Sequence, residues 1–169
     1  MDWPRPEPVC SVRLLLEPLA VAHAASMVDV LADPSLYEHT GGDAPSLDLL
    51  HRKYAAQTVG QSDDGSQWWL NWIVTYRDTG EPVGFVQATV ECDGSMLVAE
   101  IAWVISPRRQ GEGIASEATQ MMIGWLRAHE VNRFSAHIHP EHHASMGVAR
   151  NQALRPISAE KDRETRWVS

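Results

Sequence analysis

The segment SPRRQGEGIASEA, residues Ser106–Ala118, is the most informative stretch of this chain. It separates an apolar segment, residues 96–105, from residues 114–129, where apolar side chains recur at helical spacing. Gly111 and Gly113 allow the backbone to turn tightly and a ligand to approach it closely. The free N–H groups and the dipole of the following helix favour an anion at the same place. The segment therefore predicts a phosphate-binding turn between a strand and a helix.

Two common phosphate-binding motifs do not fit this turn. A P-loop requires Lys followed by Ser or Thr after its last glycine, whereas Ile114 and Ala115 follow Gly113. A dinucleotide fingerprint requires a small Gly or Ala three residues after Gly113, and that position holds Ser116. A bare Gly-x-Gly is equally compatible with an ordinary helix start, so the interpretation depends on the flanking segments.

The pattern Arg108-x-x-Gly111-x-Gly113, between a buried strand and a helix, resembles the pyrophosphate loop of the GNAT superfamily of N-acetyltransferases. Two longer segments are similar to its ribosomal-protein N-terminal acetyltransferase branch. They are EIAWVISPRRQGEGIASEATQMMIGWL, residues 100–126, and HPEHHASMGVARNQALRP, residues 139–156. The expected element order agrees with this family as well.

The resemblance covers most of the chain, from about Val12 to Val168, and its most specific part is residues 100–118. It implies that acetyl-CoA is the cofactor, with its pantetheine arm beside the main chain of Ile105, where two central strands splay apart. Backbone amides would wrap the pyrophosphate, Ser145 matches a residue that often contacts the cofactor, and His142 stands in the same neighbourhood where the family often has Asn. The implied cofactor contacts are Ile105, Arg108, Arg109, Gln110, Gly111, Glu112, Gly113, Ile114, His142 and Ser145.

The chain departs from the family in its tyrosines. Many GNAT enzymes use a Tyr beyond the helix expected here at residues 143–152 to protonate the departing thiolate. This sequence has only Tyr37, Tyr54 and Tyr76, all upstream of that helix. Another donor or solvent would serve, or no acid is needed because a CoA thiolate is a tolerable leaving group.

Glu100 is the candidate catalytic base. It stands in the middle of an apolar segment, where a carboxylate is costly unless it is paired or useful. Burial there would raise the pKa of its carboxyl toward neutrality, which suits a base for an ammonium substrate. The alternative is a structural carboxylate at a strand end, paired with an Arg.

Four histidines, His137, His139, His142 and His143, gather within a short stretch. Zinc sites use histidine, but this spacing matches no standard signature and no Cys lies nearby in the sequence. We therefore expect no metal, and polar histidines that line a cleft or the surface.

Length and composition set the broad class. The chain has 169 residues, 44% of them hydrophobic, which predicts one domain over residues 11–169 after an irregular, proline-rich lead, residues 1–10. No apolar run approaches the ~20 residues of a membrane span, and no basic stripe suggests nucleic acid. Cys10 and Cys92 form no CxxC pair, so the expected location is the reducing cytoplasm.

The charges are unevenly distributed. Residues 1–105 have a net charge of −10 and residues 106–169 one of +2. This split suits a protein that holds a cationic amine on one side and an anion on the other, although surface scatter explains it equally well. The acids that could hold such an amine are Asp43, Asp48, Asp63, Asp64, Glu91 and Asp93.

Periodicity predicts an α/β fold: a mixed, mostly antiparallel sheet of six to seven strands with helices on both faces. The expected strands are 12–16, 68–76, 83–90, 96–105, 134–139 and a hairpin over 156–168; the expected helices are 23–31, 46–56, 114–129 and 143–152.

The predicted function is transfer of an acetyl group from acetyl-CoA to a primary amine, by direct attack in a ternary complex. The acceptor would be a protein N-terminus or a small cationic amine, and a homodimer stays open. Alternatives are another acyl-CoA donor, or a non-catalytic acyl-CoA sensor or interaction module with the same fold.

Overall fold

The structure is a computed structural model that describes residues 3–161 and 164–169. Its strands are β1 (Val9–Cys10), β2 (Leu14–Pro18), β3 (Gln67–Tyr76), β4 (Pro82–Asp93), β5 (Met96–Ile105), β6 (Val131–Ile138), β7 (Arg155–Lys161) and β8 (Glu164–Val168). Its α-helices are α1 (Ala24–Val30), α2 (Leu47–Gln57), α3 (Ile114–Ala128) and α4 (His143–Asn151), with 3₁₀ turns η1 (Val21–His23), η2 (Pro34–Tyr37) and η3 (Pro107–Arg109).

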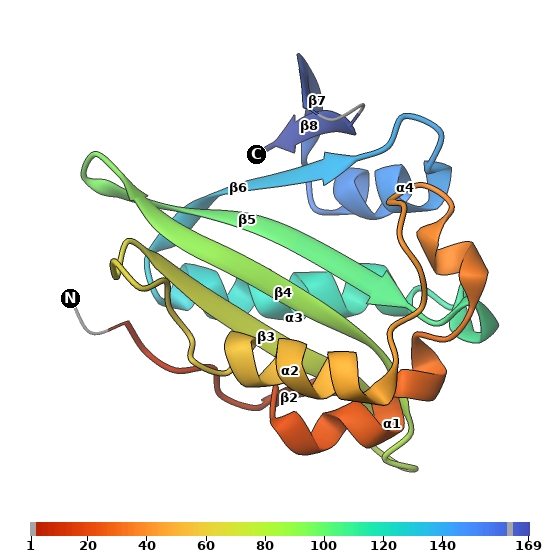
Figure 1. Cartoon of the computed structure of the whole chain (residues 1–169). Helices are drawn as coiled ribbons and strands as arrows, with labels where there is room; N and C mark the ends of the chain where they lie inside the picture. The colour runs from red at the N-terminus through yellow and green to blue at the C-terminus, as the bar shows by residue number, and fades with distance from the viewer. Residues whose placement is uncertain (1–2, 162–163) are drawn as a thin grey trace.

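All eight strands form one sheet in the order β1-β2-β3-β4-β5-β6-β8-β7 (Figure 1). Every pair is antiparallel except β5 and β6, so the sheet is mixed and mostly antiparallel, as predicted. The described residues contribute eight strands to it, where six to seven were expected. One reason is that Val9 and Cys10 pair with β2, so the segment expected to be irregular through residue 10 ends in a short strand.

The helices cover both faces of the sheet (Figure 1). On one face α3 buries Ile114, Ala118 and Leu126 against apolar side chains of the strands, including Trp72. On the other face α1 and α2 form a smaller core around Ile73. The alternation of side chains along each strand supplies both cores, because successive residues point to opposite faces.

The N-terminal segment packs onto the main core. The indole of Trp3 stacks on that of Trp68, with ring centroids 5.4 Å apart. The indole N–H of Trp72 donates to the carbonyl of Glu7 at 2.8 Å. Residues before β2 therefore belong to the folded unit. None of the helices in the described part of the chain has the length and apolar character of a membrane span.

The strands β5 and β6 separate before either of them ends. Their parallel pairing runs from Leu97 with Val131 to Glu100 with Ser135, whereas β5 continues to Ile105. β4 stays paired with β5 as far as Ile105, so β6 is the strand that diverges. The end of β5 is therefore left without a neighbour on its β6 side, next to the turn that leads into α3.

Candidate active site

The turn between β5 and α3 has the conformation that its glycines predict. Gly111 and Gly113 lie in the left-handed region, with φ of +82° and +75°. A Cβ at Gly111 would meet nothing within 4 Å, so this glycine is required for backbone conformation rather than for space. Gly113 is the N-cap of α3 and no described side chain caps the first turn, so its N–H groups are available to an anion.

Arg13, on the segment that leads into β2, holds this turn from outside. Its Nε donates to Glu117 Oε2 at 2.7 Å, and its Nη2 donates to the carbonyl of Glu112 at 2.8 Å. Ser11 Oγ donates to the other oxygen of Glu117 at 2.6 Å. The acid in the first turn of α3 is thus paired with Arg13, which limits its repulsion of an anion bound at the same helix end.

The side chains of the turn are held toward the β3–β4 hairpin. Tyr76 donates its hydroxyl hydrogen to Glu112, and this hydrogen bond raises the pKa of Tyr76. Arg109 forms an ion pair with Glu81 at 2.8 Å, which raises the pKa of its guanidinium, and lies over the Tyr76 ring. The charges of Arg109 and Glu112 are therefore paired toward the hairpin, while the backbone N–H of Arg109 donates to the carbonyl of Ser106 at 2.9 Å.

Arg108 has a different environment from its neighbour. It is exposed, and within the described residues it forms no ion pair at salt-bridge distance. The pKa of Asp33 is lowered by hydrogen bonds from Ser35 and, more weakly, by the charge of Arg108. Of the two adjacent arginines, Arg108 is the one whose positive charge is available to a phosphate.

The main chain of Ile105 faces the side that β6 has left. The N–H of Ser106 donates to the carbonyl of Val83 at 2.8 Å, so Ser106 points toward β4. Because these groups alternate along a strand, those of Ile105 point the other way. The carbonyl of Ile105 accepts a hydrogen bond from the side-chain amide of Gln110 at 3.2 Å. An amide N–H of a ligand would therefore find an acceptor at the Ile105 carbonyl if the Gln110 side chain moved aside.

His142 and Ser145 lie together at the start of α4, which packs beside the first turn of α3. His142 Nε2 is 3.4 Å from Ser145 Oγ. Burial, together with the nearby His39 and His139, lowers the pKa of His142. Asn151 donates to Ser116 Oγ at 2.8 Å, which joins α4 to α3. This contact joins the C-terminal end of α4 to the first turn of α3, whereas His142 and Ser145 lie at the other end of α4.

The predicted burial of Glu100 is wrong. Its side chain is 59% exposed, because Ala99 and Ile101 point into the α3 core while Glu100 points to the opposite face. That face is not covered by a helix at this position. The partner of Glu100 is also not an Arg: His137 Nδ1 lies 3.1 Å from Glu100 Oε1. The carboxylate therefore stands on an open sheet face, paired with an imidazole.

A cleft of about 330 Å³ lies on the same sheet face, beside α2. Thr89, which lines it, is the register partner of Glu100. The lining combines an indole, carboxamides and one amine: Lys53, Ala56, Gln57, Trp69, Asn71, Gln87, Ala88 and Thr89.

None of the six acids proposed for a cationic amine is among the residues that line this cleft. Asp64 instead accepts hydrogen bonds from Ser62 and Ser66 in its own turn, and these lower its pKa to about 2. The net negative charge of residues 1–105 therefore does not come from the residues that line the cleft.

Sequence reasoning missed three residues at this site. Arg13, Tyr76 and His39 reach the turn or α4 from distant parts of the chain. Their spacing along the sequence bears no relation to the motif at residues 108–113. The pairing of β2 with β3 places Leu14 beside Tyr76 and so brings Arg13 close to Tyr76. No local sequence signal indicates this pairing.

Comparison with known proteins gives a family and a fold. The family described as acetyltransferase (GNAT) domain matches residues 13–155. A GNAT-family acetyltransferase from Bacillus anthracis is 16% identical in sequence and superposes with a TM-score of 0.76. The superposition covers 96% of this chain and 98% of that one. Comparison with curated proteins found no match.

Two further solved structures carry a more specific description. RimL, a ribosomal L7/L12 alpha-N-protein acetyltransferase in complex with coenzyme A, is 15% identical over 96% of this chain and 97% of that one, with a TM-score of 0.74. An acetyl transferase from Salmonella typhimurium, which modifies the N-terminal serine of a 50S ribosomal subunit protein, is 15% identical over 96% and 98%, with a TM-score of 0.75. At this identity the likeness shows the fold, and the family match over residues 13–155 shows that the chain belongs to the GNAT family of acetyltransferases.

Proposed function

We propose that this protein transfers an acetyl group from acetyl-CoA to a primary amine by direct attack within a ternary complex. The observation that carries this proposal is the separation of β5 from β6 after Glu100 and Ser135. It leaves an unpaired strand edge that leads directly to the glycine turn and the free start of α3. A long, amide-containing cofactor arm that ends in a pyrophosphate matches that sequence of groups.

The residues of the turn would divide the work of binding. The backbone amides from Gly111 to Ile114 would hold the pyrophosphate, helped by the dipole of α3 and the charge of Arg108, whereas the amides of Arg109 and Gln110 already donate to the carbonyls of Ser106 and Pro107. The carbonyl of Ile105 would accept a pantetheine amide in place of the side chain of Gln110. His142 and Ser145, at the start of α4, would contact the cofactor on the side away from β5. Acetyl-CoA, once bound, supplies the activated acetyl group as a thioester.

Glu100 and His137 would remove the proton that the ammonium form of the acceptor carries. If His137 donates Nδ1–H to the carboxylate, Nε2 holds the lone pair that accepts a proton. The neutral amine nitrogen then bonds to the acetyl carbon as the carbon–sulfur bond breaks, CoA leaves as the thiolate, and the nitrogen releases its extra proton to solvent to give the amide. Tyr76 binds Glu112 on the β3–β4 side of the turn, so we assign it no role as an acid and expect solvent to protonate the thiolate.

The lining of the cleft favours a protein N-terminus over a small cationic amine. Gln57, Asn71 and Gln87 present carboxamides that can both donate to and accept from a peptide backbone, beside the indole of Trp69. Lys53 on the same wall would repel a polyamine. The ribosomal-protein acetyltransferases among the structural neighbours act on substrates of this class, which gives the proposal further support.

Release of CoA thiol in the presence of different acceptors tests this function. A short peptide with a free N-terminus is compared with the same peptide acetylated at its N-terminus, and with a polyamine and an aminoglycoside. We expect thiol release with the free peptide and none with the blocked one. Equal release with the free and the blocked peptide would exclude the N-terminal amine as the acceptor, and preference for the polyamine would overturn the peptide assignment.

A further inference from the structure

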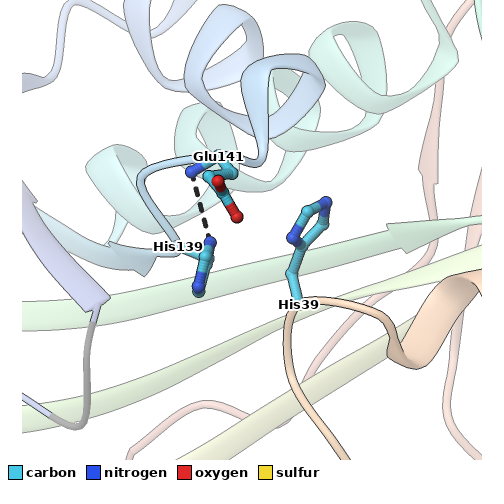
Figure 2. A group of neighbouring side chains, drawn as sticks. All are labelled: His39, His139 and Glu141. Carbon is cyan, nitrogen blue, oxygen red and sulfur yellow. Dashed lines mark hydrogen bonds between the residues drawn. The ribbon is translucent and has the colours of Figure 1, made fainter.

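Three metal-binding side chains meet between two segments that are far apart in the sequence. His39 lies between η2 and α2, and His139 and Glu141 lie on the turn between β6 and α4. One potential ligand atom from each lies within 4.8 Å of the others. Figure 2 shows both imidazole rings and the carboxylate turned toward one shared space.

From this arrangement we propose that His39, His139 and Glu141 bind a zinc ion. Two imidazole nitrogens and a carboxylate oxygen are ligands that Zn²⁺ prefers, whereas Mg²⁺ and Ca²⁺ prefer oxygen alone. Three protein ligands with a fourth position open to water is a common zinc arrangement. The site is independent of the acetyl-transfer proposal, since no cofactor contact is among its three ligands.

The site needs a small contraction to close on the ion. Zinc–ligand bonds of about 2.0–2.2 Å in a tetrahedron place the ligand atoms roughly 3.4 Å apart. Glu141 is exposed and stands on a turn, so its carboxylate can move inward without disturbing the core. The rings of His39 and His139 already stack, with centroids 5.1 Å apart, so the two histidines are already neighbours.

The hydrogen bonding of His139 is compatible with this role. Its Nδ1 accepts the backbone N–H of Glu141 at 3.2 Å (Figure 2), so Nδ1 carries the lone pair of the neutral ring and the ring hydrogen is on Nε2. A metal would replace this long hydrogen bond. His39 also stacks on His142, with centroids 4.8 Å apart, and this second contact helps to hold the His39 ring.

A bound ion would tie the segment between α1 and α2 to the β6–α4 turn. Figure 1 shows that segment rising past the end of β5 toward α4. The chain around His39 carries little regular structure, and a metal bond would hold it in one place. The sequence did not predict the site because His139 and Glu141 alone give no zinc spacing and His39 stands 100 residues earlier.

Isothermal titration with ZnCl₂ tests the site on the full chain, without a histidine tag and after dialysis against a chelator. We expect one zinc per chain, and with Co²⁺ the visible absorption of a tetrahedral complex. His39→Asn and Glu141→Gln should each weaken binding at least tenfold, about 1.4 kcal/mol. His143→Asn is the matched control, because His143 is exposed at the first position of α4, two residues after Glu141, and is not part of the group.

Hydrogen exchange supplies a second readout, since zinc should slow exchange in residues 38–46 of the wild type and not of His39→Asn. Circular dichroism verifies that each variant is folded, and if one is not, the other serves alone. Wild-type binding no tighter than that of the folded variants would overturn the proposal, as would equal weakening in His143→Asn. Unchanged exchange in residues 38–46 at saturating zinc would likewise contradict it.

Discussion

Glu100 and Ser135 form the last paired position between β5 and β6, although β5 continues to Ile105 and β6 to Ile138. The end of the pairing at these two residues has three structural consequences. It leaves the Ile105 main chain unpaired on the β6 side, and it sets Glu100 and His137 at the point where the strands part. The same opening leads to the glycine turn, so it connects the proposed base to the proposed cofactor site.

The first prediction concerns the backbone of the turn. Gly113→Val should lower the affinity for acetyl-CoA at least tenfold, about 1.4 kcal/mol, because a β-branched residue strongly disfavours the φ of +75° found there. Titration calorimetry measures it. Gly124→Val is the control, since Gly124 lies in the same helix without positive φ and a Cβ there meets nothing within 4 Å. Equal affinity of the folded Gly113→Val protein and the control would refute the pyrophosphate assignment.

The second prediction concerns the base. Glu100→Gln should lower the rate at neutral pH by about 10²–10⁴-fold and leave acetyl-CoA affinity near that of the wild type. The loss should shrink at high pH, where the amine deprotonates by itself. Glu91→Gln, an exposed acid on β4, should have no effect.

The partner of this base gives an independent check on the second prediction. Because Glu100 and His137 would act as a unit, the double variant Glu100→Gln/His137→Asn should lose no more than the worse single variant. Pre-steady-state rates over a pH series measure both effects. Wild-type rates at pH 7 in either single variant would move proton removal to solvent or to another group.

The third prediction concerns the support of the turn from β2. Arg13→Ala removes the hydrogen bonds to Glu117 and to the Glu112 carbonyl, and it leaves the Glu117 carboxylate unpaired near the anion site. Acetyl-CoA affinity should fall about fivefold, equivalent to about 1 kcal/mol, the scale of a partly exposed ion pair. Arg52→Ala is the control, because Arg52 is an exposed residue of α2. A drop of the same size in both variants would show that general charge, and not this contact, matters.

Local sequence signals predicted the elements of the fold well. Ser46 was placed at the start of a helix, and its Oγ accepts the N–H of Leu49 as an N-cap. The alternation of side chains from Trp68 to Tyr76 predicts β3, and Gly111 and Gly113 predict the turn before α3. These features depend on residues close in sequence, for which periodicity and capping are direct physical causes.

Features that depend on tertiary placement were not predictable. Glu100 lies in an apolar strand, and the strand itself does not determine whether this side chain is buried. The packing of α1 and α2 determines which part of the sheet face stays exposed. The contacts of His39 with the β6–α4 turn and of Arg13 with Glu112 join residues about a hundred positions apart. No pattern in one sequence specifies such a pairing.

The most direct test of the central claim is the melting temperature with and without acetyl-CoA, because it requires no acceptor. A ligand that binds only the folded chain stabilises it by about 2.7 kcal/mol at a hundredfold excess over its dissociation constant. For a domain of this size, that corresponds to a rise of roughly 5–10 °C. We expect this rise with acetyl-CoA, nearly the same with desulfo-CoA, much less with NAD, and at most about half of it at the same concentration with Gly113→Val. An unchanged melting temperature at millimolar acetyl-CoA, or an equal rise with NAD, would contradict a CoA site between β5, β6 and α3.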